Sequence, residues 1–573
     1  MLKAKRKKIL NILFIMIMTL IFCLPYLNST ISVIPEQDLT FHLNRIVGIA
    51  NALEEGQILP KIYPYANFGF GYATSLFYCD IFLYPFAILY HFGLPVVLSY
   101  KLCIFSYTLL GTVLMCMAMN RIFKNDKIAV ISSILYLFAN YHIQNIYIRS
   151  ALGEILAMSF IPLVLLAFYE ILIERKDSYK LLGISFSLLV MSHLISSLLY
   201  GLLFLILIII FIILNRKDIE AIKKMFVTTI KGTLLAILLC VWYLLPMFEQ
   251  LQDQEFWLNA NQQYNNLQAG KQGLFDIFKP LAINDINRFD ITYEANIGIL
   301  YILLCSIYVF VKKNRYINIL LLIMLAIYII IIGIIPSISI LNVIQFLFRF
   351  YIVLFSLFTI IISYNLQYIN VKYTNIIGIV IILFSIFNII NTNNFLSTSK
   401  HKLDNYATIE DVNNINASVD DGLDYNRDEL GGAEYLPYTV NMNYKAENNS
   451  IKTIDNNGNK VDYAWEYERN FTTIVYNYND DEDRELLFPL SYYKGYKAYE
   501  IIDDKLNPIP VNNYDIYKLV SINAKAGEHT YLITYEGTII QSISLFVSFI
   551  TLAIFIMYEI IGKIKNKGET WIK

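Results

Sequence analysis

The stretch from Asp38 to Arg45, Asp-Leu-Thr-Phe-His-Leu-Asn-Arg, combines residue types and spacing that favour chemistry. Asp38, His42 and Arg45 are spaced i, i+4 and i+7, so in a helix they would line one face. An acid, an imidazole and a guanidinium beside a membrane surface have the chemistry to act on a phosphorylated lipid. The alternative is an amphipathic helix at the interface whose polar face is only solvated.

The composition indicates a membrane protein. The chain of 573 residues is 57% hydrophobic and 16% charged, whereas a soluble protein carries about 25% charged residues. Apolar runs bounded by Lys/Arg clusters predict a polytopic α-helical membrane protein. We expect twelve spans, with both termini cytoplasmic, at about 9–29, 96–119, 128–146, 151–173, 179–197, 198–214, 226–248, 296–311, 316–336, 347–367, 375–390 and 539–562.

Residues 76–93 are apolar enough to cross, but they contain Asp80, Pro85 and His91. We therefore interpret them as a re-entrant or interfacial segment. On this topology a transmembrane domain covers residues 1–390, with a first extracytoplasmic loop at 30–75. The last helix and a cytoplasmic tail occupy 539–573.

Residues 391–538 predict an acidic, extracytoplasmic, mainly β domain. They hold 25 acidic and 13 basic residues, which leaves 21 acidic and 32 basic residues for the rest of the chain. The segment 472–478 alternates with period two, and 518–522 and 529–535 flank a hairpin signal, so we expect a small β-sandwich. Because no basic soluble face exists, the charge pattern disfavours nucleic acid as a partner.

Ionisable residues within or beside the apolar runs form a second set of candidates, because each is costly at membrane depth. Arg149 and Glu154 lie at the outer ends of two spans, where they could hold a phosphate and orient it, or form a structural pair. His193 is either a site residue or an interhelical hydrogen-bond partner. Arg349, flanked by Phe348 and Phe350, fits a phosphate clamp or an interfacial anchor.

Two loop residues complete the candidate set. Lys61 follows the first-loop helix and could supply positive charge to a lipid phosphate, although most loop lysines are simply solvated. Glu434 could reach the membrane face or lie on the surface.

Several catalytic motifs are absent from the sequence. No Walker A, GxGxxG, HExxH, GxSxG or DxD motif occurs in a suitable context, and the six cysteines form no metal motif. This disfavours ATP-driven transport and transfer from a nucleotide sugar. We expect no resident cofactor and no metal ligands. A single loop acid makes a poor site for a divalent metal, although the sequence does not exclude one.

Seven short motifs resemble those of the YfhO-like bacterial membrane proteins, a group that includes members labelled 6-pyruvoyl-tetrahydropterin synthase-related. The motifs, spread over nearly the whole chain, are Asp38–His42 with Gly56–Lys61, Gly69–Tyr72 with Phe77-Tyr78, Arg149–Glu154, Glu434–Pro437 and Tyr492–Tyr496. The group is similar to the GT-C class of glycosyltransferases, which bind polyprenyl-phosphate sugars and carry an acid in the first extracytoplasmic loop.

The resemblance implies that Asp38 is the catalytic acidic residue of the first loop and that Arg149 and Glu154 are site residues. It also implies sugar transfer from a polyprenyl-phosphate donor to a cell-envelope glycopolymer, at the outer face of a bacterial cell membrane. His42, Arg45, Lys61, His193, Arg349 and Glu434 complete the expected substrate-binding set. The alternatives are a transporter or flippase of lipid-linked saccharides, and a non-catalytic envelope scaffold.

Overall fold

A computed structural model describes residues 2–27, 38–64, 66–67, 69–260, 271–284, 296–334, 339–403, 434–438, 452–454, 460–462, 467–514 and 518–570. The chain divides into two compact units, and each is described by itself. Unit 1 contains residues 1–39, 97–236 and 263–412. Unit 2 contains residues 40–96, 237–262 and 413–573.

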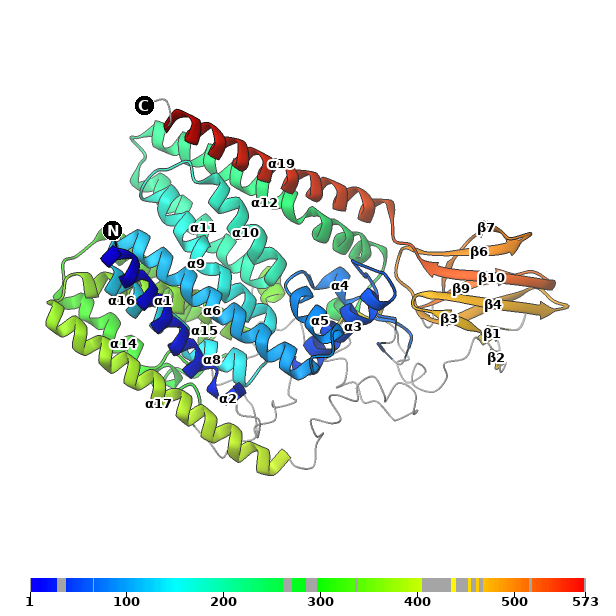
Figure 1. Ribbon diagram of the computed structural model, residues 1–573, viewed down its shortest axis with the longest axis horizontal. Coiled ribbons are helices and arrows are strands. Elements are labelled where there is room, and N and C mark those ends of the chain that lie inside the picture. Colours follow the sequence, from blue (N-terminus) through cyan, green and yellow to red (C-terminus); the bar gives the residue numbers. More distant parts are fainter. Residues whose placement is uncertain are drawn as a thin grey trace. The chain divides into compact units, whose positions relative to one another are not determined.

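Unit 1 is built from helices (Figure 1). They are α1 (Leu2–Phe22), α2 (Leu24–Leu27), α6 (Val96–Phe123), α7 (Asp126–Leu137), α8 (Asn140–Tyr147), α9 (Leu152–Leu172), α10 (Tyr179–Ser192), α11 (Leu194–Leu214), the first half of α12 (Ile219–Asp253), η1 (Asp276–Phe278), α14 (Ile299–Ser306), η2 (Ile307–Phe310), α15 (Arg315–Ile331), η3 (Ser339–Ile344), η4 (Leu347–Phe350), α16 (Tyr351–Gln367) and α17 (Val371–Leu403). Among them, α16 is buried along almost its whole length.

Seven helices in the described part of the chain are long and apolar enough to cross a membrane, so the expectation of about twelve spans is not confirmed. They are Val96–Phe123, Leu152–Leu172, Leu194–Leu214, Ile219–Asp253, Leu347–Gln367, Val371–Ser397 and Ile539–Gly562. Three further predicted spans form shorter apolar helices, Tyr179–Ser192, Ile299–Phe310 and Arg315–Ile331. The hydropathy pattern located these segments correctly, but it did not reveal where the helices end.

Two of these differences are breaks between helices. The predicted span 128–146 is divided into α7 and α8, which are separated by Phe138 and Ala139. The predicted pair 179–197 and 198–214 is divided instead at His193, whose extended backbone ends α10. His193 then caps α11, because its Nδ1 accepts a hydrogen bond from the backbone N–H of Ser196 at 3.2 Å.

Unit 2 combines the first loop with a β region and the last helix. It contains α3 (Leu39–Glu54), α4 (Thr74–Phe77), α5 (Tyr84–His91), α13 (Trp257–Ala260), the second half of α12 and α19 (Ile539–Thr570). Its strands are β1 (Lys452–Ile454), β2 (Lys460–Asp462), β3 (Glu468–Asn470), β4 (Thr473–Asp480), β5 (Arg484–Ser491), β6 (Tyr496–Ile502), β7 (Lys505–Ile509), β8 (Asn512–Tyr514), β9 (Leu519–Ala524) and β10 (Gly527–Tyr535). Residues 76–93 form no continuous helix, in agreement with their interpretation as a non-crossing segment.

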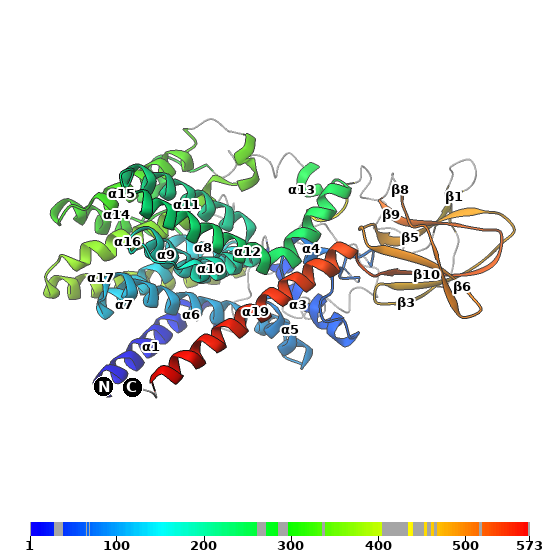
Figure 2. The same ribbon diagram turned by 90° about the horizontal axis from the view of Figure 1, so that it is seen from above.

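The strands form two antiparallel sheets, which Figure 2 shows as separate layers. Their orders are β2-β1-β5-β9-β8 and β3-β4-β10-β6-β7. Tyr476 of one sheet meets Phe488 of the other edge to face, with ring centroids 6.2 Å apart. The predicted β-sandwich is therefore present, and the alternating segment 472–478 falls in β4.

The predicted hairpin is wrong. Segments 518–522 and 529–535 are strands β9 and β10, as expected, but β9 pairs with β5 and β8 while β10 pairs with β4 and β6. The short connection around Ala526 passes from one sheet to the other. β9 is buried at nearly every position, whereas β10 mixes exposed, half-buried and buried residues, and strand pattern alone does not identify the partner.

Within unit 2 the sandwich is attached to the first loop and to the end of α12. The Arg469 guanidinium donates to the carbonyl oxygens of Pro64 at 2.8 Å and Gly69 at 2.5 Å. The Gln250 side chain exchanges hydrogen bonds with the backbone of Lys494, at 2.7 and 3.0 Å. The first loop and the β region are thus one packed body.

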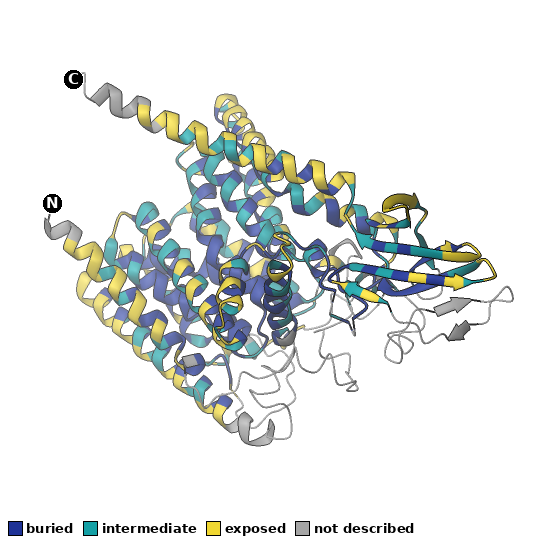
Figure 3. Ribbon diagram, turned by 45° about the vertical axis from the view of Figure 1, so that its right-hand side comes forward, coloured by how far each residue is buried: buried dark blue, intermediate teal, exposed yellow. Residues whose placement is uncertain are grey.

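The boundary expected at residue 390 lies inside a helix. α17 continues to Leu403, and the first strand of the described chain begins at Lys452. At the other end of the β region, α19 exposes apolar residues along its length (Figure 3). Ser548 of α19 donates to the carbonyl oxygen of Leu238 at 2.8 Å, which joins α19 to the second half of α12.

Candidate functional site

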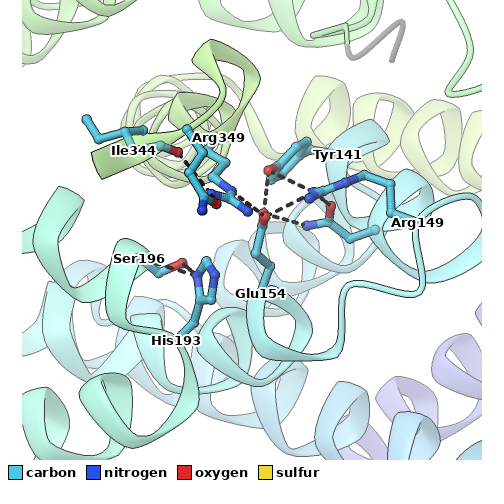
Figure 4. A network of polar contacts seen from close by, with 9 residues as sticks. Tyr141, Arg149, Glu154, His193, Ser196, Ile344 and Arg349 are labelled. Carbon is cyan, nitrogen blue, oxygen red and sulfur yellow. Dashed lines mark hydrogen bonds and ion pairs between the residues drawn. The ribbon is translucent and has the colours of Figure 1, made fainter. Parts of the chain in front are cut away.

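Glu154 is the centre of a buried polar cluster in unit 1 (Figure 4). It lies in the first turn of α9, and only 2% of its surface is exposed. Its carboxylate accepts hydrogen bonds from the Tyr141 hydroxyl, from Asn145 Nδ2 at 3.2 Å and from Arg149 Nη1 at 3.0 Å. Arg349 Nε approaches the same carboxylate at 3.3 Å. Two cations therefore share one buried anion.

Arg149 is held by the helix that precedes it. Its Nη1 donates to Asn145 Oδ1 at 2.7 Å and reaches the Tyr141 hydroxyl at 3.3 Å. Its guanidinium carbon lies 4.7 Å from the centroid of the Phe348 ring. Ser150, with φ of +52°, turns the chain sharply between Arg149 and α9. This turn brings Arg149 back toward Glu154.

Arg349 comes from a distant part of the chain, in the single turn η4. Its Nη1 donates to the carbonyl oxygen of Ile344 at 2.9 Å and to Gln345 Oε1 at 2.5 Å. Its guanidinium also lies over the Phe346 ring, at 5.1 Å from the centroid. Gln345 has a φ of +66°, so the backbone before η4 is as sharply turned as the backbone at Ser150.

Asp38 interacts with this cluster through the charge of its carboxyl group and through a backbone hydrogen bond. It is a half-buried turn residue, and its N–H donates to the Arg149 carbonyl oxygen at 3.3 Å. Burial raises the pKa of Asp38, although the positive charges of Arg149 and Arg349 oppose that rise. Asp38 precedes the first residue of α3, so the expected helical face shared with His42 and Arg45 is not formed. Asp38 belongs to unit 1, and those two residues belong to unit 2.

His193 lies at the break between α10 and α11, close enough to Glu154 for electrostatic interaction. Its Nδ1 contacts Ser196 Oγ at 2.8 Å in addition to the Ser196 N–H. This ring nitrogen is thus an acceptor that caps a helix, rather than the interhelical partner considered from sequence. A neutral imidazole in this arrangement carries its proton on Nε2.

Arg45 and His42 belong to a separate buried cluster in unit 2. Arg45 is 1% exposed and Asp80 5%, and Arg45 Nε donates to Asp80 Oδ1 at 2.6 Å. The Arg45 guanidinium also contacts His42 Nδ1 at 3.0 Å and donates to the Cys79 carbonyl oxygen at 2.9 Å. The Tyr63 hydroxyl donates to the other Asp80 oxygen. These contacts give Arg45 a structural role in the first loop.

The remaining two candidates also lie in unit 2. Lys61 is half-buried, with Nζ 5.3 Å from the centroid of the Trp242 ring. Glu434 is half-buried, close to Tyr72, and its carbonyl oxygen accepts from the Leu258 N–H at 2.9 Å. The structure thus groups Asp38, Arg149, Glu154, His193 and Arg349, and it places His42, Arg45, Lys61 and Glu434 in the other unit.

Sequence reasoning missed Tyr141 and Asn145, which both bond to Glu154. Tyr141 and Asn145 lie on α8, and Arg149 follows the end of that helix by two residues. The four-residue spacing of these three residues is the signal that predicts a shared face. For a metal, no group of three or more His, Cys, Asp or Glu side chains fits an ion among the residues that the structure describes. The cluster in unit 1 instead has the chemistry of an anion site with an adjacent carboxyl.

Comparison with known proteins supports the membrane assignment. One relative, a Lactococcus lactis subsp. cremoris (strain MG1363) protein described as uncharacterized, is 22% identical over 220 residues. That match covers 38% of this chain and 36% of the relative. No solved structure matches the chain.

A family described as the 6-pyruvoyl-tetrahydropterin synthase related domain, a membrane protein, matches residues 77–396, which include Arg149, Glu154, His193 and Arg349. That range is more than half of the chain, and it contains most of the long apolar helices. The chain is therefore a multi-pass membrane protein that belongs to the 6-pyruvoyl-tetrahydropterin synthase related family.

Proposed function

We propose that this membrane protein is a GT-C-type glycosyltransferase. It would move a sugar from a polyprenyl-phosphate donor to a cell-envelope glycopolymer at the outer face of a bacterial membrane. The observation that carries the proposal is the convergence of Arg149 and Arg349 on Glu154, with the Asp38 carboxyl influenced by both guanidiniums. A leaving phosphate needs such cations, and an acceptor hydroxyl needs such a base.

In the proposed reaction the Asp38 carboxylate takes the proton of the acceptor hydroxyl. The hydroxyl oxygen attacks the anomeric carbon as the bond from that carbon to the phosphate oxygen breaks. The electron pair of that bond leaves with the polyprenyl phosphate, and the anomeric configuration inverts. Arg149 and Arg349 stabilise the negative charge on the departing phosphate.

The contacts of Arg349 fit a phosphate-binding role. Its bonds to described residues use Nε and Nη1, which leaves Nη2 for a phosphate oxygen. Glu154 would hold both guanidiniums in place before the donor binds. His193, with a proton on Nε2, is the candidate donor to a sugar hydroxyl or phosphate oxygen near Glu154.

The topology of the proposal has both termini in the cytoplasm and the β-sandwich outside, where it would position the acceptor. The test is release of polyprenyl phosphate by the full-length purified protein in lipid, supplied with candidate polyprenyl-phosphate sugars and envelope glycopolymer. Asp38→Asn should reduce transfer by about 10²–10⁴-fold while donor binding persists. The matched control is Asp218→Asn, which alters an exposed carboxylate of unit 1 paired with Arg175. Transfer by Asp38→Asn at the wild-type rate would refute the mechanism.

A transporter of lipid-linked saccharides is the second candidate, and the helix break at His193 favours it. Transporters commonly bind substrates where membrane helices are interrupted. The two candidates differ in their product. A transporter would move the intact donor across a sealed vesicle membrane without releasing polyprenyl phosphate, and Asp38→Asn would leave that movement intact.

A further inference from the structure

Lys61 is a half-buried lysine in unit 2 that forms no ion pair with an acidic residue of the described first loop. The nearby Asp80 carboxylate already accepts from Arg45 and from Tyr63. Among the described residues, no carboxylate lies in salt-bridge contact with Lys61, and its contact is the face of the Trp242 ring. Burial lowers the pKa of Lys61, so an anion placed beside the ammonium would offset an existing desolvation penalty.

An exposed apolar stripe begins twenty residues after this lysine in the sequence. The stripe consists of Ile81, Pro85, Ile88, Leu89 and Phe92, on and beside α5, and Phe92 is 80% exposed. Their spacing of four, three, one and three residues places them on one helical face. The stripe begins directly after Cys79 and Asp80, with which Lys61 interacts electrostatically.

The segment that carries Lys61 is fixed to α5. The Tyr84 hydroxyl donates to the carbonyl oxygen of Ile58 at 2.7 Å, and the Ile58 side chain is itself 73% exposed. The other face of α5 is covered by protein, since Phe86 and Ala87 are buried. The apolar stripe is therefore the outward face of an ordered element.

Trp242 connects this region to helices whose apolar side chains face outward. It lies in α12, and its backbone N–H donates to Ser548 Oγ of α19 at 3.2 Å. Nearby, Leu238 and Leu245 of α12 and Phe549 of α19 are exposed. Helices of this length and composition expose such residues to lipid tails. Lys61 thus lies between an apolar loop element and a lipid-facing helix of the same unit.

We propose that Lys61 and Trp242 bind the phosphate of an anionic membrane phospholipid, whose acyl chains lie against the α5 stripe. The Lys61 ammonium complements the negative charge of the phosphate, and tryptophan is enriched in the headgroup region of membranes. The apolar stripe favours a phospholipid over free phosphate, because free phosphate has no apolar group to contact it. The inference does not rest on the proposed glycosyl transfer, because Lys61 and the Arg149 cluster belong to different units.

Native mass spectrometry of the full-length protein in mild detergent tests this inference. The probes are phosphatidylglycerol, phosphatidylcholine and undecaprenyl phosphate, each added in titration. Wild-type protein should bind phosphatidylglycerol more tightly than phosphatidylcholine. Lys61→Met should weaken phosphatidylglycerol binding about fivefold, which corresponds to one lysine at an anionic surface, and Lys61→Arg should retain it.

The matched control is Lys505→Met, which removes an exposed lysine of β7 in the same unit. It should leave both affinities unchanged. Ile88→Ser alters only the exposed stripe, so it tests the surface even where Lys61→Met fails to fold, and it should weaken both phospholipids. Equal phosphatidylglycerol binding by wild type and Lys61→Met, or by wild type and Ile88→Ser, would overturn the inference. Binding of undecaprenyl phosphate alone would also overturn it, because the site would then serve the donor.

Discussion

Replacing Glu154 with glutamine removes the one carboxylate that both Arg149 and Arg349 share. The two guanidinium side chains are 7% and 11% exposed, at 3.0 and 3.3 Å from the same carboxylate oxygen. A glutamine has nearly the same shape, but it offers one acceptor oxygen and no charge. Its amide group would also face the Tyr141 and Asn145 donors, which now bond to Oε2.

The expected loss of stability follows from this burial. Removing one partner of a buried ion pair typically costs about 3–5 kcal/mol, because the other charge stays desolvated. The two pairs share one oxygen, so their contributions do not add, and we expect about 3–5 kcal/mol for Glu154→Gln as a whole. Removing a second member then costs less than it would alone. Glu154→Gln combined with Arg349→Gln should be less destabilised than the sum of the two single variants.

The assay is denaturant or thermal unfolding of the full-length protein in one detergent, with wild type measured in parallel. Asp218→Asn is the control, because its partner Arg175 forms an ion pair of similar length, 2.7 Å, with both side chains more than two-fifths exposed. Solvent screening makes such a pair weak, so this variant should unfold close to wild type. Equal shifts for Glu154→Gln and Asp218→Asn, or fully additive losses in the double variant, would refute the reasoning.

Three further predictions concern single positions. Burial raises the pKa of Asp38, so the fold favours its protonated form and becomes less stable as the pH rises from the unfolded-state value through the folded one. Asp38→Asn should therefore melt above wild type at neutral pH, with the difference vanishing below about pH 3.9. Gly298→Ala should cost about 1–3 kcal/mol in the unfolding assay, because φ is +88° and the new Cβ would lie 2.8 Å from Asn140 Nδ2. Arg469→Gln, which loses its bond to Pro64, should make the first loop more sensitive to limited proteolysis, whereas Lys505→Gln should not.

The sequence predicts those parts of the fold that depend on local pattern. Long apolar runs such as Leu152–Leu172 are helices, and the alternation in 472–478 is a strand. Helix ends were harder to place, because they depend on single side chains. The cap formed by His193 divides an apolar stretch at residue 193, whereas hydropathy places the division between residues 197 and 198. Strand partners were also hidden, since β9 and β10 are adjacent in sequence but belong to different sheets.

Parts of the candidate site could also be predicted, and charge burial explains why. Arg149, Glu154 and Arg349 are ionisable residues in apolar surroundings, so each needs a partner. The sequence does not show that these residues are each other's partners. Arg349 and Glu154, for example, are 195 residues apart in the chain. Tyr141 and Asn145 are neutral, so no such requirement identified them. Only their four-residue spacing from each other and from Arg149 in the sequence carried a signal.

The stretch from Asp38 to Arg45 illustrates how nearby candidates acquire different roles. Arg45 has its counter-ion in Asp80, so this buried pair carries no net charge with which to attract a phosphate. The cluster at Glu154 differs. Two guanidiniums interact with Glu154 and Asp38, and burial raises the pKa of Asp38, so protonation of Asp38 would leave the cluster with one positive charge in excess. Binding of an anion there would lower that excess and shift Asp38 further toward protonation, so donor binding and ionisation of the proposed base oppose each other.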